Sequence, residues 1–184
     1  MIGNSTTAWG FVSRYLHWIA AILIVVLVVH GWWMTEFPPR EARLAQYAWH
    51  ASVGYLLLAL MLARVFWRLA NAVPGLPGTP AWERAAAVTG HWALYVLIFA
   101  ASFTGWALSG TLRQPLDSVF GVARIPPIVG AGGRGLHESL ERWHSILAWT
   151  LAVLVVVHVV AAIWHWAVRR DGVMQRMLRS APQP

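Results

Sequence analysis

"HSILAWTLAVLVVVHVVAAIWHW", residues 144–166, is long enough and apolar enough to cross a bilayer, which takes about 20 residues of helix. The stretch nevertheless carries His144, His158 and His165. A buried imidazole without a partner is costly in lipid, and ionisable residues inside membrane helices usually have a function. The stretch therefore predicts a membrane helix whose histidines either hydrogen-bond within a helix bundle or hold a ligand.

The composition of the whole chain agrees with a membrane protein. Of its 184 residues, 58% are hydrophobic and 11% are charged, whereas soluble domains carry about 25% charged residues. The chain has no cysteine, which excludes disulfides, thiolate metal sites and cysteine-ligated iron–sulfur clusters. Its net charge of +7 comes from arginines that lie beside apolar runs. We therefore expect them to meet lipid headgroups, and we expect no nucleic-acid partner.

Four segments have the length and hydropathy of a membrane span: residues 15–34, 47–67, 90–110 and 143–168. A short turn-rich segment separates the first span from the second, and prolines with glycines separate the second from the third. Residues 111–142 form the longest connection. The polar N-terminus lacks a clear cleavage site, so we expect the first span to remain in the protein. The sequence predicts an all-α integral membrane protein, with residues 1–184 forming a single four-helix bundle domain.

The arginines also predict an orientation. One side of the membrane would hold six arginines and five acidic residues, the arginines being Arg40, Arg43, Arg113, Arg124, Arg134 and Arg142. The other side would hold eight arginines and two acidic residues, the arginines being Arg14, Arg64, Arg68, Arg84, Arg169, Arg170, Arg176 and Arg179. The positive-inside rule makes the second side cytoplasmic, with both termini there. We refer to the two sides as outer and inner.

The histidines form two pairs at two depths. His144 and His158 are 14 residues apart, which brings them within about 40° of the same helix face and about 21 Å apart along the axis. The first span runs outward, so His17 lies at the inner depth of His158. The second span runs inward, so His50 lies at the outer depth of His144. Two such pairs suit two haems with both axial positions occupied, which favours electron transfer over oxygen chemistry.

Gly54 lies one helical turn after His50 and on the same face. It either leaves space for a haem macrocycle or allows neighbouring helices to pack closely. The sequence favours neither interpretation.

The other histidines are weaker ligand candidates. His30 lies about 140° round the helix from His17 and cannot share its face. His91, at the start of the third span, competes with His17 for the inner site. We expect interfacial hydrogen bonding for all four: His30, His91, His165, and His137 in the connection before the fourth span. For His30 and His91, contact with a substrate or with haem propionates is an alternative.

Several stretches together resemble the bacterial cytochrome b561 family. They are "SRYLHW" (13–18), "WHASVGYLLLALMLARVFWRL" (49–69), "GHWALYVLIF" (90–99), "HESLERWHSILAW" (137–149) and "VVVHVVAAIWHW" (155–166). The resemblance covers about residues 11–180 and rests on the ordered set rather than on any one motif. One departure is "ASFTGW" (101–106), where relatives often have proline before the glycine.

The resemblance implies a four-helix dihaem b membrane protein of the bacterial inner membrane. The family's ligands fall on His17 and His158 for the inner haem b and on His50 and His144 for the outer haem b, as the depth argument expects. Inner propionates would be held by Arg14, Arg64 and Arg68, unless these arginines only follow the positive-inside rule. Outer propionates, lipid phosphates or a small anion would be held by Arg113 and Arg142, with Arg124 and Arg134 nearby.

Stand-alone members of this size resemble superoxide:ubiquinone oxidoreductase. We therefore expect an oxidoreductase that passes electrons from superoxide or another periplasmic donor to ubiquinone. One alternative is a haem-b anchor subunit that links quinone to a hydrogenase or formate dehydrogenase. Another is a non-haem transporter or structural membrane protein. Beside lipid and quinone, a redox protein as donor and a second copy of the chain remain open as partners.

Overall fold

The computed structural model describes residues 1–75, 79–112 and 114–178. Arg113 and Arg179 lie outside the described residues. Four long helices have the length and apolarity needed to cross a membrane: α1 (Phe11–Glu36), α2 (Arg40–Ala70), α3 (Ala81–Gly110) and α4 (Arg134–Trp164). A π-helical turn, η1 (His165–Arg169), extends α4. The four predicted spans and the all-α membrane bundle are therefore confirmed.

The helices extend beyond the predicted spans, and two histidines change place as a result. His137 lies in α4 rather than in the connection before it, and His91 is ten residues inside α3 rather than at its start. A hydropathy window marks only the apolar part of a helix. Good helix formers such as Ala, Glu and Arg continue it into the polar flanks. α2 and α3 begin directly after Pro39 and Pro80, where proline is tolerated.

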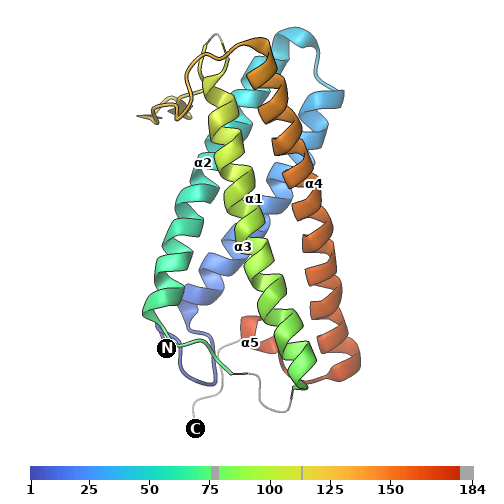
Figure 1. Ribbon diagram of the computed structural model, residues 1–184. Helices are drawn as coiled ribbons and strands as arrows, with labels where there is room; N and C mark the ends of the chain where they lie inside the picture. Colours follow the sequence, from blue (N-terminus) through green and yellow to red (C-terminus); the bar gives the residue numbers. More distant parts are fainter. Residues whose placement is uncertain (76–78, 113, 179–184) are drawn as a thin grey trace.

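The helices run along the length of the bundle, and α1 crosses obliquely behind α3 (Figure 1). α1 packs against α2, α2 against α3, and α3 against α4, while α1 and α4 contact each other much less. α1 begins and α4 ends at one end of the bundle, which we call the terminal end. The described residues of the connection from α3 to α4, 111–112 and 114–133, lie at the opposite end, which we call the loop end.

An apolar layer occupies the middle of the bundle. Ala20 and Ile24 of α1 meet Leu57 and Met61 of α2 there, and Met61 is completely buried. Tyr95, Ile98 and Leu151 from α3 and α4 complete the cluster. Leu151 lies midway between His144 and His158 along α4. The layer therefore separates the two predicted histidine pairs.

The loop-end connection contains a small hairpin that the sequence analysis did not predict. β1 (Ser118–Val119) pairs antiparallel with β2 (Ala123–Arg124), and positive φ angles at Phe120 and Gly121 turn the chain between them. Buried Ser52 of α2 fixes the hairpin: its hydroxyl accepts a hydrogen bond from the Phe120 amide at 3.0 Å. Tyr55 donates to the Leu116 carbonyl at 3.0 Å.

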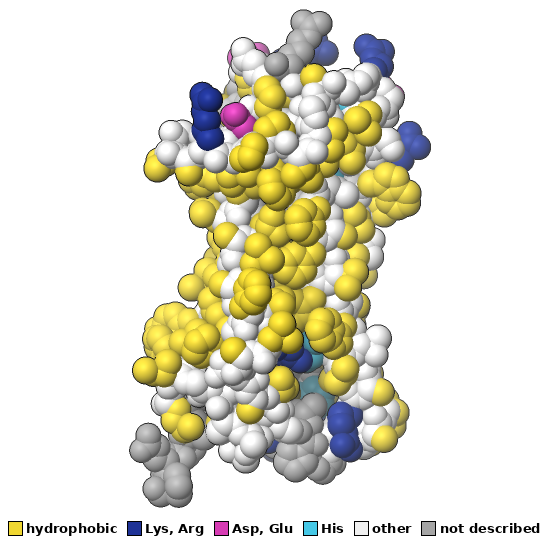
Figure 2. Space-filling model, turned by 60° about the vertical axis from the view of Figure 1, so that its left-hand side comes forward, with side chains coloured by type: hydrophobic (Ala, Val, Ile, Leu, Met, Phe, Trp, Pro, Cys, Tyr) yellow, Lys and Arg dark blue, Asp and Glu magenta, His cyan; other side chains and the backbone are white. Residues whose placement is uncertain are grey.

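The terminal end is held by polar contacts between distant segments. The Trp18 indole donates to the Met177 carbonyl in α5 (Gln175–Leu178), and Arg169 pairs with Glu83 of α3 at 3.0 Å. Figure 2 shows a broad hydrophobic surface along the middle of the bundle, with charged side chains towards its ends. This distribution is the one that a bilayer requires.

Candidate functional site

The structure brings His50 and His144 together near the loop end. Their ring centroids are 6.2 Å apart, and the ring planes are 88° apart. His50 comes from α2 and His144 from α4, as the depth argument predicted. We call these two residues the loop-end pair.

The ring of His144 is fixed by α3. Its Nδ1 donates a hydrogen bond to the Ala101 carbonyl oxygen at 3.0 Å, so Nε2 keeps its lone pair. Gly105 lies against the same ring, because a Cβ added there would stand 2.9 Å from His144 Cε1. A hydrogen bond from one ring nitrogen to a carbonyl, with the other nitrogen free, is the usual state of a metal-binding histidine.

The ring of His50 is bordered by α1. A Cβ added at Gly31 would stand 3.3 Å from His50 Cε1, so glycine allows α1 to approach. The neighbouring residue, His30, stacks beside His50 with ring centroids 5.8 Å apart and planes 20° apart. Nδ1 of His50 is buried and has no hydrogen-bond partner among the described residues.

His17 and His158 form the terminal-end pair. Their ring centroids are 6.3 Å apart, and the planes are 61° apart. His91 of α3 lies close by, with its ring centroid 5.5 Å from that of His158. Three histidines therefore meet at this end, and the competition between His91 and His17 that the sequence suggested is present in the structure.

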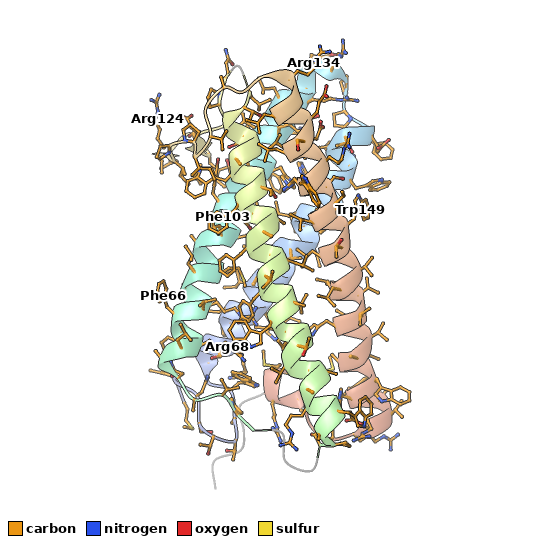
Figure 3. All side chains as sticks on the ribbon, viewed as in Figure 1. Phe66, Arg68, Phe103, Arg124, Arg134 and Trp149 are labelled. Carbon is orange, nitrogen blue, oxygen red and sulfur yellow. The ribbon has the colours of Figure 1, made fainter. Side chains whose placement is uncertain are left out.

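Two arginines of α2 belong to the terminal-end cluster. Arg64 donates from Nη2 to His17 Nδ1 at 2.8 Å. Arg64 and Arg68 both lie over the Tyr95 ring, with Cζ to centroid distances of 5.5 and 6.0 Å. Arg68 points towards the interior in Figure 3, and Figure 2 shows arginine and histidine side chains in a hollow near this end. Arg14, on the first turn of α1, is half-buried.

Both pairs have the spacing that an iron between two histidines requires. An imidazole nitrogen binds a metal at about 2 Å, so two imidazoles on opposite sides of one iron have ring centres about 6 Å apart. The separations of 6.2 and 6.3 Å agree with this value. A Cβ at Gly54 would meet nothing within 4 Å, so Gly54 does not serve close packing between described helices. The residues present fit a haem at each pair.

The remaining predicted residues lie farther out. Arg142, Arg124 and Arg134 are exposed, and Figure 3 shows Arg124 on the hairpin pointing away from the bundle. The other histidines make hydrogen bonds, as expected by default: His30 with Gln46, His137 with Thr111, and His165 with Asp171. The sequence did not predict that the His50 and His144 rings lie against Gly31 and Gly105. The only available signal was a glycine at the depth of each ligand.

Comparison with known proteins agrees with this arrangement. The family model described as prokaryotic cytochrome b561 matches residues 8–180.

The chain belongs to the prokaryotic cytochrome b561 family. It is 33% identical to cytochrome b561 homolog 2 of Escherichia coli K12, over 95% of this chain and 93% of the relative. It is 28% identical to the probable superoxide oxidase CybB of Yersinia pestis, over 89% of this chain and 91% of that relative. It is 26% identical to a probable Ni/Fe-hydrogenase B-type cytochrome subunit of Cupriavidus necator, over 90% of this chain and 82% of that relative.

Membership of the cytochrome b561 family makes the chain a multi-pass bacterial membrane protein that binds b-type haem and takes part in electron transport. This favours the cytochrome interpretation over a non-haem transporter or structural protein. Its partners are membrane lipid and redox proteins or molecules.

Proposed function

We propose that this cytochrome b561 binds two haems b and carries electrons between the two faces of the membrane. The observation that carries the proposal is the presence of two histidine pairs with matching separations of 6.2 and 6.3 Å. Their α4 members stand about 21 Å apart along the helix axis. Bound at the pairs, the haems would supply reversible one-electron oxidation and reduction.

At the loop end, His50 and His144 would be the axial ligands. The Ala101 carbonyl orients His144, and Gly31 and Gly105 leave room for the two rings. Gly54 would face the macrocycle, since a side chain there meets no described atom within 4 Å. Arg142, with Arg113, would serve outer propionates or an anion.

At the terminal end, His17 and His158 would be the ligands. An arginine can only donate, so the neutral His17 ring that accepts from Arg64 at Nδ1 carries its hydrogen on Nε2. Binding of iron through Nε2 therefore requires Arg64 to leave Nδ1. A propionate is the acceptor that would receive Arg64, together with Arg68 and Arg14.

The terminal end would face the cytoplasm, with the protein in the inner membrane. The excess of arginine over acidic residues supports this orientation: among the described residues it is seven against two at the terminal end, and five against five at the loop end. Reporter fusions at the C-terminus should behave as cytoplasmic and insertions in residues 111–133 as periplasmic. The reverse pattern would refute the orientation.

We propose superoxide or another periplasmic donor as reductant and ubiquinone as acceptor. Two superoxide ions would each lose one electron and become O2, and ubiquinone would gain two electrons and two protons. Support comes from the relative named superoxide oxidase. The relative named as a hydrogenase cytochrome subunit supports a second candidate, an anchor that links quinone to a hydrogenase or, by the same logic, a formate dehydrogenase. Co-purification with a catalytic subunit would favour the anchor.

The ligand assignment is tested by haem content. Purified protein should contain two haems b per chain, and His144→Ala and His158→Ala should each lose one. His91→Ala and His137→Ala are matched histidine controls and should keep both. If His91→Ala loses a haem while His17→Ala keeps both, the terminal-end assignment is wrong.

The reaction is tested by anaerobic mixing of the purified protein with superoxide, ubiquinol or a candidate reductase while the haem bands are followed. We expect rapid reduction by superoxide and reoxidation by ubiquinone. If neither superoxide nor ubiquinol reduces the haems, the proposed reaction is wrong, but the haem assignment still stands.

A further inference from the structure

His30 has an arrangement that the proposed function does not use. It lies on α1, with its ring centroid 5.8 Å from that of His50 and 4.4 Å from that of Trp49. It is not a member of either histidine pair. Its ring stacks beside that of His50, a predicted iron ligand.

The hydrogen bond to Gln46 determines which nitrogen of His30 carries the hydrogen. His30 Nε2 lies 3.1 Å from the amide oxygen of Gln46, which can only accept. Nε2 is therefore the donor, and Nδ1 of the neutral ring is left with a lone pair. That Nδ1 atom is buried and has no hydrogen-bond partner among the described residues.

His50 presents the complementary group. If its Nε2 binds iron, its Nδ1 carries the remaining hydrogen and needs an acceptor. Nδ1 of His50 lies on the side of α1, since a Cβ at Gly31 would stand 3.8 Å from it. It too is buried without a partner among the described residues. A donor and an acceptor, each lacking a partner, thus belong to two neighbouring rings.

We propose that His30 is a positioning residue for the loop-end haem. The two Nδ1 atoms are not hydrogen-bonded to each other in the structure, and with iron held at His50 the rings would turn so that His30 accepts the Nδ1 hydrogen of His50 while Gln46 holds His30. This proposal rests on the proposed function, because it needs iron at His50. An accepted hydrogen bond makes an imidazole ligand more basic, which stabilises ferric over ferrous iron. The Ala101 carbonyl does the same for His144. His30 therefore lowers the midpoint potential of the loop-end haem and fixes the plane of the His50 ring.

The test compares redox titrations of full-length purified variants, with the loop-end haem identified as the one lost in His144→Ala. His30→Phe keeps an aromatic ring without an acceptor. At a fixed potential near the midpoint, we expect the ferrous-to-ferric ratio of the loop-end haem to rise roughly threefold to tenfold. Its ferric electron paramagnetic resonance signal should also shift. The terminal-end haem should not change.

Two further variants separate hydrogen bonding from packing. His30→Asn restores an acceptor and should return the ratio towards the wild-type value. Trp49→Phe disturbs the ring packed against His30 but keeps the acceptor, and it should leave the ratio unchanged. An unchanged ratio in His30→Phe, or an equal rise in Trp49→Phe, would overturn the proposal.

If His30→Phe fails to keep the loop-end haem, Gln46→Leu decides. This variant leaves both histidines in place but frees the His30 hydrogen to move from Nε2 to Nδ1. We therefore expect a smaller rise in the ferrous-to-ferric ratio of the loop-end haem, and an unchanged ratio would overturn the proposal. A wild-type protein without b-type haem would overturn this inference together with the proposed function. Two intact haems with potentials insensitive to His30 would overturn the inference alone.

Discussion

Two glycines at the loop-end pair have different surroundings, and alanine substitution separates their roles. At Gly54 an added Cβ meets no described atom within 4 Å, and alanine favours a helix over glycine by about 1 kcal/mol. Gly54→Ala should therefore keep or raise the thermal stability of haem-free protein. If Gly54 faces a macrocycle, the same variant should bind the loop-end haem more weakly.

Gly105→Ala is the contrasting variant. Its Cβ would lie 2.9 Å from His144 Cε1, so the ring must move whether or not haem is bound. Haem titration of both variants, followed by absorbance and thermal unfolding, checks the distinction. If Gly54→Ala and wild type bind haem with equal affinity, Gly54 does not face the haem.

At the scale of the residue, the sequence predicted which histidines meet but not what holds their rings. Helix geometry assigns depth and face, and that was sufficient to pair His17 with His158 and His50 with His144. The contact between His30 and His50 depends on how closely α1 approaches α2. That approach depends on Gly31, whose effect is visible only when both helices are in place.

At the scale of the element, one hydroxyl of α2 joins the loop-end hairpin to the bundle. Ser52 accepts from the Phe120 amide at 3.0 Å, and its hydroxyl lies 2.8 Å from the Ala48 carbonyl and 3.2 Å from the Ser118 carbonyl. Ser52→Ala leaves the Phe120 amide without this acceptor, at a cost of about 0.5–1.5 kcal/mol. We expect faster hydrogen exchange and proteolysis in residues 116–125, with both haems retained. Unchanged exchange there would contradict this role for Ser52.

The end of η1 has a pH-sensitive contact. Burial raises the pKa of Asp171, but hydrogen bonds from His165 and the Val173 amide outweigh it, and the pKa lies below its ordinary value. A lowered carboxyl pKa stabilises the fold above the ordinary pKa of 3.8, and this contribution is lost as the pH falls through the folded value. The melting temperature of wild type should exceed that of Asp171→Asn at neutral pH.

The same comparison in acid provides the control. The difference in melting temperature should disappear below the folded pKa of Asp171, because both side chains are then neutral. A difference that persists unchanged at the lowest pH would assign the effect to packing rather than to charge.

The elements themselves follow from hydropathy, whereas their ends do not. Apolar runs predicted all four helices, because a helix is one of the few structures that pair every backbone N–H and C=O group inside a bilayer. The first turns of α4, including His137, are polar and gave no such signal. The hairpin also escaped prediction, since its two-residue strands depend on Ser52, which is distant in sequence.

At the scale of the whole molecule, the two sites differ in their surroundings. Ala101 and, by our proposal, His30 accept hydrogen bonds from the loop-end ligands, which favours ferric iron. Arg64 and Arg68 lie beside the terminal-end pair and, by our proposal, would offset the negative charge of the propionates there, which favours ferrous iron. The loop-end haem should therefore have the lower midpoint potential, by on the order of 60 mV for a one-electron couple.

This order would drive electrons from the loop end to the terminal end. Equilibrium redox titration, with each haem assigned by a single ligand variant, measures it directly. Arg64→Gln should narrow the gap by lowering the terminal-end potential. The opposite order of potentials would contradict the direction of transfer that we propose.

Each histidine pair takes one member from α4, the last long helix in the chain. During synthesis, α1 and α2 enter the membrane with His17 and His50 while their counterparts are still untranslated. If these pairs bind haem as proposed, neither cofactor can receive its second ligand until the C-terminal helix has been inserted. Haem loading is then a late event in biogenesis, and a ribosome that stops before α4 releases a product without complete haem sites.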